Sequence, residues 1–205
     1  MTTHLGLQRI LLPSAQVSQL TTGSITLPSA RTAFVPPTSY ESIATVSPTS
    51  GTSVEFTSIP STFTHLQIRG IGRTARTNVE DGFYLRFNST TTGYNEHHIY
   101  GTSTIYSFAN TGSDTEIETY TLPGNNAISN LYGSVIVDIL DYANTNKFKT
   151  LRLLGGYSNN STNGRMEFVS GLWRNTNAIT SITMIAGNST WVSGSTFALY
   201  GIKGA

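Results

Sequence analysis

The chain contains no cysteine, few charged residues and no long apolar run. Across 205 residues the charged side chains make up 11%, against about 25% in an ordinary soluble protein. The absence of cysteine excludes disulfides, thiol catalysis and thiolate-bound zinc. Lys and Arg number 12 and Asp and Glu number 11, so the formal charge is +1. This balance provides no general attraction for polyanions, and we expect no nucleic-acid partner.

No stretch approaches the roughly 18 apolar residues that indicate a membrane-spanning helix. The N-terminus lacks the basic flank and apolar segment of a secretory signal peptide. We therefore expect synthesis in the cytoplasm and no membrane insertion. The chain is rich instead in small hydroxyl residues, with 32 Thr and 24 Ser. With 38% hydrophobic and 10% aromatic residues, the composition still supports one core of ordinary size.

Residues 1–40 follow a different pattern from the rest. Six of the seven prolines lie in the first 60 residues, and Arg9 and Arg31 are the only formal charges of the first 40. Proline removes a backbone donor and fixes φ, which excludes long helices and central strands here. We predict an extended arm, whose apolar side chains dock on a partner or back on their own domain because exposure costs roughly 25 cal/mol per Å². The expected attachment residues are Leu5, Leu7, Ile10, Leu11, Leu12, Ile25, Leu27, Phe34 and Val35.

Residues 41–205 show the periodicity of β-structure. In Phe83–Asn88 the odd positions are apolar and the even positions polar or amphipathic, as in a strand with one buried face. Many short strands joined by turn-forming residues favour an all-β, jelly-roll-like sandwich. The best short helical candidate is 126–131. The predicted strands are 42–46, 53–57, 64–69, 83–88, 98–108, 116–121, 134–140, 148–154, 166–173, 179–185 and 196–202.

The sequence offers only weak candidates for catalysis or metal binding. His97 and His98 are adjacent, but neighbouring strand residues point to opposite faces and cannot ligate one ion together without a bulge. The close acidic groupings are Glu80 with Asp81, Glu116 with Glu118, and Asp138 with Asp141. The P-loop, G-x-S-x-G and G-x-G-x-x-G motifs are missing. We expect no enzymatic activity, metal or cofactor; a glycan hydrolase that uses Asp138 or Asp141 stays as a third hypothesis.

Two further groups bear on binding. Arg69, Arg73, Arg76 and Arg86 form a local basic group, and acids between them predict pairing within the protein or at a subunit interface. Trp191 lies in a polar loop, where it is either an exposed stacking platform for sugars or a residue that folds back over one end of the sandwich. Asn188 and Asn160 lie in loops that would contact the same glycan.

Several segments, in the same order along the chain, resemble virion structural proteins of tailed bacteriophages. The resemblance covers about residues 40–203. It is carried by Tyr40–Val46, Val54–Gly70, Tyr84–Asn88, Val137–Asn144, Leu172–Arg174 and Phe197–Lys203. It implies a β-sandwich domain of a fibre, tail, baseplate or capsid-decoration protein, with no catalytic motif to transfer.

The resemblance implies a structural component of the phage particle, such as a short tail fibre, an adaptor or a decoration protein. Residues 1–40 would attach it and residues 41–205 would form the displayed sandwich. The implied partners are other virion proteins and further copies of the chain, with a trimer favoured. The alternative is a receptor-binding module that recognises bacterial surface glycan through Trp191, Asn188 and Asn160.

Overall fold

The computed structural model describes residues 39–160 and 163–204, with the backbone alone at 111–113. The nine predicted attachment side chains of the arm, from Leu5 to Val35, lie outside the described residues. They therefore stay a prediction.

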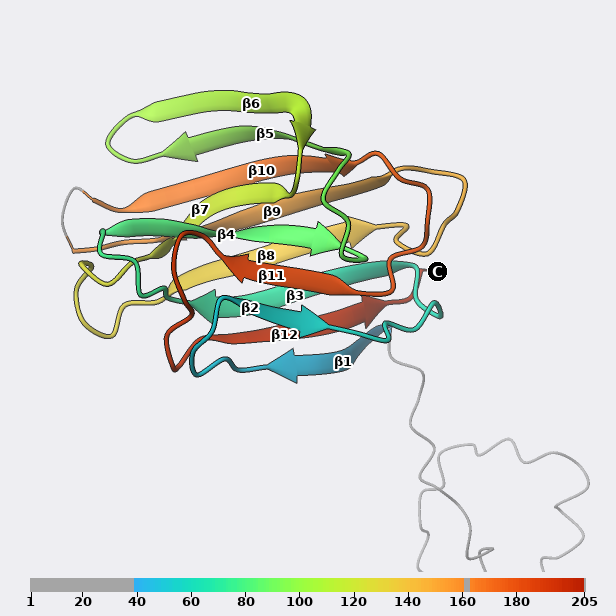
Figure 1. Cartoon of the computed structure of the whole chain (residues 1–205), viewed down its shortest axis with the longest axis horizontal. Coiled ribbons are helices and arrows are strands. Elements are labelled where there is room, and N and C mark those ends of the chain that lie inside the picture. Colours follow the sequence, from blue (N-terminus) through green and yellow to red (C-terminus); the bar gives the residue numbers. More distant parts are fainter. Residues whose placement is uncertain (1–38, 161–162, 205) are drawn as a thin grey trace, which may run out of the picture. The chain divides into compact units, whose positions relative to one another are not determined.

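The described chain forms two antiparallel sheets packed as a sandwich (Figure 1). One sheet has eight strands in the order β1-β12-β3-β8-β9-β10-β5-β6, and the other has four in the order β2-β11-β4-β7. This confirms the predicted all-β sandwich. The strands are β1 (Tyr40–Val46), β2 (Ser53–Phe56), β3 (His65–Gly72), β4 (Glu80–Phe87), β5 (Tyr94–Gly101), β6 (Ile105–Asp114), β7 (Ile117–Pro123), β8 (Gly133–Leu140), β9 (Lys149–Tyr157), β10 (Arg165–Trp173), β11 (Ile182–Ala186) and β12 (Thr196–Ile202).

Most connections cross from one sheet to the other, as in a jelly roll. β12, the last strand, lies between β1 and β3, and β11 lies between β2 and β4. The helical candidate at 126–131 forms turns instead. Within the described ranges, no helix is long and apolar enough to cross a membrane.

The core follows from the period-two alternation of the strands. The inward positions of the larger sheet include Ile68, Val137, Leu153 and Val169, which lie directly opposite one another on β3, β8, β9 and β10. All four are fully buried. The smaller sheet contributes Phe83, Leu85 and Phe87, also fully buried, as their alternation predicted.

One predicted strand is wrong. Residues 98–108 form not one strand but parts of β5 and β6, with a hairpin turn at 102–104. The turn is closed by a hydrogen bond of 3.0 Å from the Thr102 N–H to the Thr104 carbonyl. Gly101 and Ser103 are turn-forming residues, so the sequence carries a turn signal that the predicted strand over 98–108 does not take into account.

The two sheets differ in width, and this positions the candidate site. β7 ends the smaller sheet and packs over β8, β9, β10 and β5. β5 and β6 continue the larger sheet past β7 (Figure 1). We call this β5–β6 hairpin the overhang.

Candidate functional site

Charged residues replace the apolar core where the overhang begins. Glu96 and His98 on β5, and Arg165 and Glu167 on β10, occupy inward positions. Glu96 and Glu167 are 0% exposed, His98 is 1% and Arg165 is 7% exposed. Burial of a charge is costly unless the charge is paired and hydrogen-bonded. Each of these four side chains has an oppositely charged neighbour, but Oε2 of Glu96, Nε2 of His98 and Nε of Arg165 are buried without a hydrogen-bond partner.

Glu167 is the centre of this network. Its Oε1 lies 2.6 Å from Nδ1 of His98 and 3.2 Å from Nη2 of Arg165. Because a carboxylate accepts and does not donate, Nδ1 of His98 carries a proton. Burial would raise the pKa of Glu167, but the hydrogen bond from His98 and the charge of Arg165 outweigh it and lower the pKa.

The second oxygen of Glu167 connects the two sheets. The backbone N–H of Tyr120 donates to Oε2 over 2.8 Å. Tyr120 lies on β7, the edge strand of the smaller sheet, where backbone donors lack a neighbouring strand on one side. Glu167 therefore supplies an acceptor to an edge donor in the space between the sheets.

His98 lies between two carboxylates. Its Nε2 is 3.8 Å from Oε1 of Glu96, and its ring stacks on Phe108 with centroids 4.0 Å apart. Burial would lower the pKa of His98, but the hydrogen bonds and charges of Glu167 and Glu96 outweigh it and raise the pKa above the ordinary 6.5. Glu96 also accepts a hydrogen bond of 3.0 Å from the amide of Asn110 on β6.

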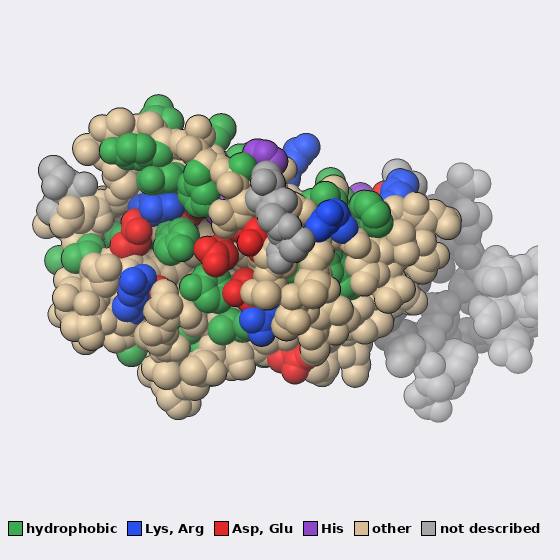
Figure 2. All heavy atoms as spheres, turned by 45° about the horizontal axis from the view of Figure 1, so that its top comes forward, with side chains coloured by type: hydrophobic (Ala, Val, Ile, Leu, Met, Phe, Trp, Pro, Cys, Tyr) green, Lys and Arg blue, Asp and Glu red, His purple; other side chains and the backbone are tan. Residues whose placement is uncertain are grey.

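Arg165 is held by rings and acids together. Its guanidinium lies 3.8 Å from the ring centroid of Tyr100 and 5.2 Å from that of Tyr120, and Nη1 is 3.2 Å from Oε2 of Glu80. Burial and the nearby Glu118 raise the pKa of Tyr120 to about 12. Figure 2 shows acidic and basic side chains gathered among hydrophobic ones on this side of the molecule. The network thus joins β4, β5, β7 and β10.

The opposite face of the larger sheet is apolar at its centre. Ile99, Phe168, Leu154 and Ile136 lie directly opposite one another on β5, β10, β9 and β8, and we call them the outer apolar row. Their exposed fractions are 58%, 41%, 49% and 37%. The parallel row formed by Ser170, Arg152, Asp138 and Gln67 is polar. A contiguous exposed apolar patch with polar neighbours marks an interaction surface, and this row is a candidate for one.

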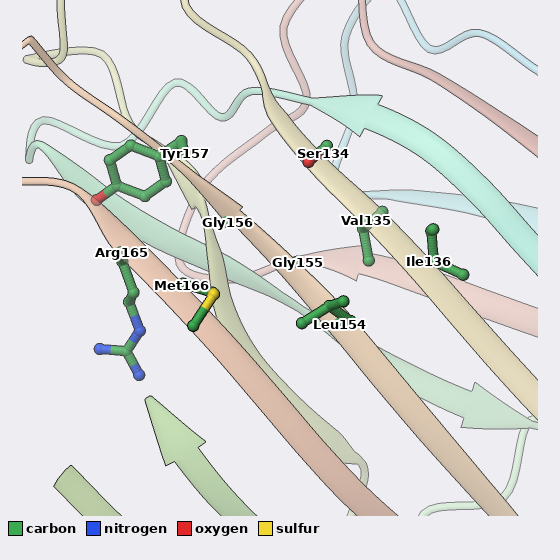
Figure 3. Close-up of a pocket in the computed structure, with 9 residues that line it drawn as sticks. All are labelled: Ser134, Val135, Ile136, Leu154, Gly155, Gly156, Tyr157, Arg165 and Met166. Atoms are coloured by element: carbon green, nitrogen blue, oxygen red, sulfur yellow. The ribbon is translucent and has the colours of Figure 1, made fainter. Parts of the chain in front are cut away.

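A shallow hollow adjoins this row (Figure 3). It exists because Gly156, opposite both Met166 and Ser134, contributes no side chain to the outer face. A Cβ at Gly156 would lie 2.2 Å from the Arg165 carbonyl oxygen, so the backbones are too close for any other residue. The hollow is lined by Ser134, Val135, Ile136, Leu154, Gly155, Gly156, Tyr157, Arg165 and Met166.

The predicted glycan residues are not brought together around an aromatic platform. Trp191 is 1% exposed and packs against Phe83 and Phe197, with ring centroids 6.4 and 4.9 Å apart. The stacking-platform interpretation is therefore wrong, and the alternative of a tryptophan folded back over the sandwich is right. Asn188 and Asn160 are exposed, in the β11–β12 and β9–β10 loops respectively.

The acids named for hydrolysis pair with other side chains. Asp138 is half-buried on the outer face and accepts a hydrogen bond from Gln67. Lys147 donates to Asp141 over 2.7 Å, and this hydrogen bond lowers the pKa of Asp141. Within the described ranges, no group of three or more His, Asp or Glu side chains could hold a metal ion.

The arginine group forms bonds within the chain. Arg76 pairs with Asp81 at 3.3 Å and Arg86 pairs with Glu116. Arg73 is buried and donates to backbone carbonyls of the 125–131 loop, while Arg69 donates to Gln67. Pairing within the protein is thus confirmed for Arg76 and Arg86.

Sequence reasoning placed His97 and His98 on opposite faces, which the structure confirms, since His97 is exposed and His98 buried. It missed the partners of His98. The sequence did contain a signal for them. Every second residue of a strand points to the same face, and Arg165 and Glu167 are in step with the inward-facing Val169 and Trp173. A charged residue at an inward position requires a buried partner.

No protein-family model matches this chain, and neither a curated protein nor a solved structure matches it. The resemblance to phage virion proteins therefore stays a prediction.

Proposed function

We propose that the chain is a structural component of a tailed-phage particle, which associates with other virion proteins and with copies of itself. The observation that carries the proposal is the outer apolar row on the eight-stranded sheet. An exposed apolar centre beside polar residues is typical of a surface that another protein covers.

The resembling segments lie on strands of both sheets. Tyr40–Val46, Val137–Asn144 and Phe197–Lys203 fall largely on β1, β8 and β12, and the end of Val54–Gly70 falls on β3. These four strands are consecutive in the larger sheet, in the order β1-β12-β3-β8. The other segments lie elsewhere, with Tyr84–Asn88 and the start of Val54–Gly70 on β4 and β2 of the smaller sheet and Leu172–Arg174 at the end of β10, so the resemblance extends over both sheets. Of the residues named for the glycan-binding alternative, Trp191 is buried, whereas Asn188 and Asn160 are exposed in their loops, and that alternative stays a prediction.

The test is co-sedimentation with particles assembled without this chain. We expect the full chain to bind such particles and Phe168→Lys to lose binding, because a buried unpaired charge opposes contact at the outer apolar row. Ser170→Lys, on the same strand and face but in the polar row, is the matched control. Failure of the unmodified chain to co-sediment would contradict the proposed function.

A further inference from the structure

The four edge strands of the sandwich are not equally protected against pairing with another chain. An exposed edge presents unpaired backbone groups, which proteins protect with charges, prolines, bulges or short strands. β2 has only four residues, one of them Glu55. β1 carries Glu41 and a bulge between Ser42 and Ala44. β7 carries Glu118, ends at Pro123 and is hydrogen-bonded by Glu167 at Tyr120.

β6 carries a bulge and Asp114 beyond Asn110, but it has none of these protections between Ile105 and Asn110. The six residues are Ile, Tyr, Ser, Phe, Ala and Asn, without charge or proline, and their register with β5 is regular. Ile105 is 79% exposed and Tyr106 47%. At about 3.4 Å per residue, this uncharged edge is about 20 Å long. Such an edge is a template for strand addition.

We propose that β6 pairs antiparallel with β6 of a second copy of this chain, with Ser107 opposite the partner's Ser107. The two larger sheets would become one continuous sheet across a twofold axis. The pairing stands independently of the proposed function, since it rests on the edge and not on the resemblance. A twofold contact closes with two chains, in contrast to the trimer that the resemblance favoured.

The register follows from the faces of the strand. Paired residues must lie on one face, and Tyr106 and Phe108 point inward while Ile105, Ser107 and Ala109 point outward. If the twofold axis passes between the two Ser107 residues, Tyr106 lies opposite the partner's Phe108, and symmetry forms this pair twice. Ile105 then lies opposite the partner's Ala109. Aromatic cross-strand pairs are among the stabilising ones. Centring on Phe108 would instead oppose Tyr106 to an asparagine.

Three side chains of β6 are fixed in position by contacts with β5 within the same chain. Tyr106 stacks on Tyr100 with ring centroids 5.1 Å apart, and Phe108 stacks on His98. Asn110 is held by Glu96. On the outer face, Ser107 lies directly opposite Ile99, the end of the outer apolar row. Pairing would therefore bring the two outer apolar rows into line across the joined sheet.

Single cysteines test the register directly, because the chain has none of its own. Opposed Cα atoms in antiparallel strands are about 4.5–5.5 Å apart, which a disulfide spans. Ser107→Cys in the full chain should form a disulfide-linked dimer on mild oxidation. Ala109→Cys is the matched control: it is exposed on the same face, but the two copies would be about 13 Å apart along the strand.

We expect Ser107→Cys to cross-link at least about tenfold faster than Ala109→Cys, since only the former meets the geometry of a disulfide. Equal rates, faster cross-linking of Ala109→Cys, or no dimer from either variant would each overturn the pairing. The result is separate from co-sedimentation with particles: either test can fail while the other succeeds.

Discussion

β7 and β6 are the edge strands of the two sheets on the same side of the sandwich, but the surroundings of their free edges differ. The edge of β7 lies over the larger sheet, and the carboxylate of Glu167 accepts a hydrogen bond from its Tyr120 N–H. β6 continues beyond β7 and presents an uncharged, exposed edge from Ile105 to Asn110. At the covered edge of β7, a buried side chain accepts a hydrogen bond from the backbone. At the peripheral edge of β6, the backbone is accessible for hydrogen bonds with another chain.

A single row of directly opposed inward residues shows where the change occurs. From β8 to β6 the row consists of Val137, Leu153, Val169, His98 and Phe108. The first three are apolar and lie in the sandwich core. The charged network begins at the next strand, β5. There the backbone N–H groups at the edge of β7 require hydrogen-bond acceptors, at the point where the overhang starts.

Removing the charge that supports β7 should have the largest effect. Glu167→Gln leaves Arg165 and a protonated His98 without their shared carboxylate, and loss of one member of a buried pair costs about 3–5 kcal/mol. We expect Glu167→Gln to lower the free energy of unfolding, measured in urea, by about 3 kcal/mol. The value lies at the low end of this range because Glu80 still pairs with Arg165. The control Glu55→Gln, at an exposed site on β2, should change stability by less than about 0.5 kcal/mol. A similar small change for Glu167→Gln would show that the network does not support the fold.

The same network predicts a pH dependence. The raised pKa of His98 means that its contribution is fully present below 6.5, the unfolded value, and is lost as the pH rises through the folded pKa. The lowered pKa of Glu167 means that its contribution is present above 4.5 and is lost as the pH falls through its folded pKa. Both contributions are therefore complete between pH 4.5 and 6.5.

His98→Asn tests this window. The wild-type protein should exceed the variant by about 2 kcal/mol of unfolding free energy at pH 5.5, the value of a hydrogen bond to a charged group, and by less as the pH rises. Urea unfolding from pH 4 to pH 9 measures it. His97→Asn, at the exposed neighbouring position, is the control and should show no such window. A difference for His98→Asn that is constant across this range would exclude the charged pair.

Ser107→Lys should have the smallest effect on stability. Ser107 is exposed on β6, so we expect the substitution to change the free energy of unfolding of the isolated chain, at low concentration, by less than about 0.5 kcal/mol. A lysine at an edge opposes strand addition, and association should be lost. Glu167→Gln should behave in the opposite way, with lower stability and retained association. If both variants lost stability and association together, the two edges would not be separate features.

The sequence alone predicts most of the fold, because alternation such as that of Phe83, Leu85 and Phe87 reports burial locally. The prediction of one strand over 98–108 misses the break between β5 and β6, although Gly101 and Ser103 are turn-forming residues. The sequence leaves two alternatives for Trp191, because the loop is polar and the burial of the side chain comes from contacts with Phe83 and Phe197, remote in sequence.

The charged network shows the same limit. The inward parity of Glu167 is visible on β10, but its partners come from two other strands, β5 for His98 and β7 for Tyr120. Which strands are neighbours depends on the sheet order, which no local pattern specifies. The open edge of β6 is likewise visible only once the sheet order shows that β6 is the last strand.

The most direct test of the account is the molar mass of the full chain and of Ser107→Lys, measured by light scattering over a series of concentrations. The account predicts a rise toward twice the 22.1 kDa chain mass for the unmodified protein, and the mass of one chain for the variant. A single-chain mass for both proteins, or a multiple-chain mass that Ser107→Lys leaves unchanged, would contradict the assignment of β6 as the edge through which two copies assemble.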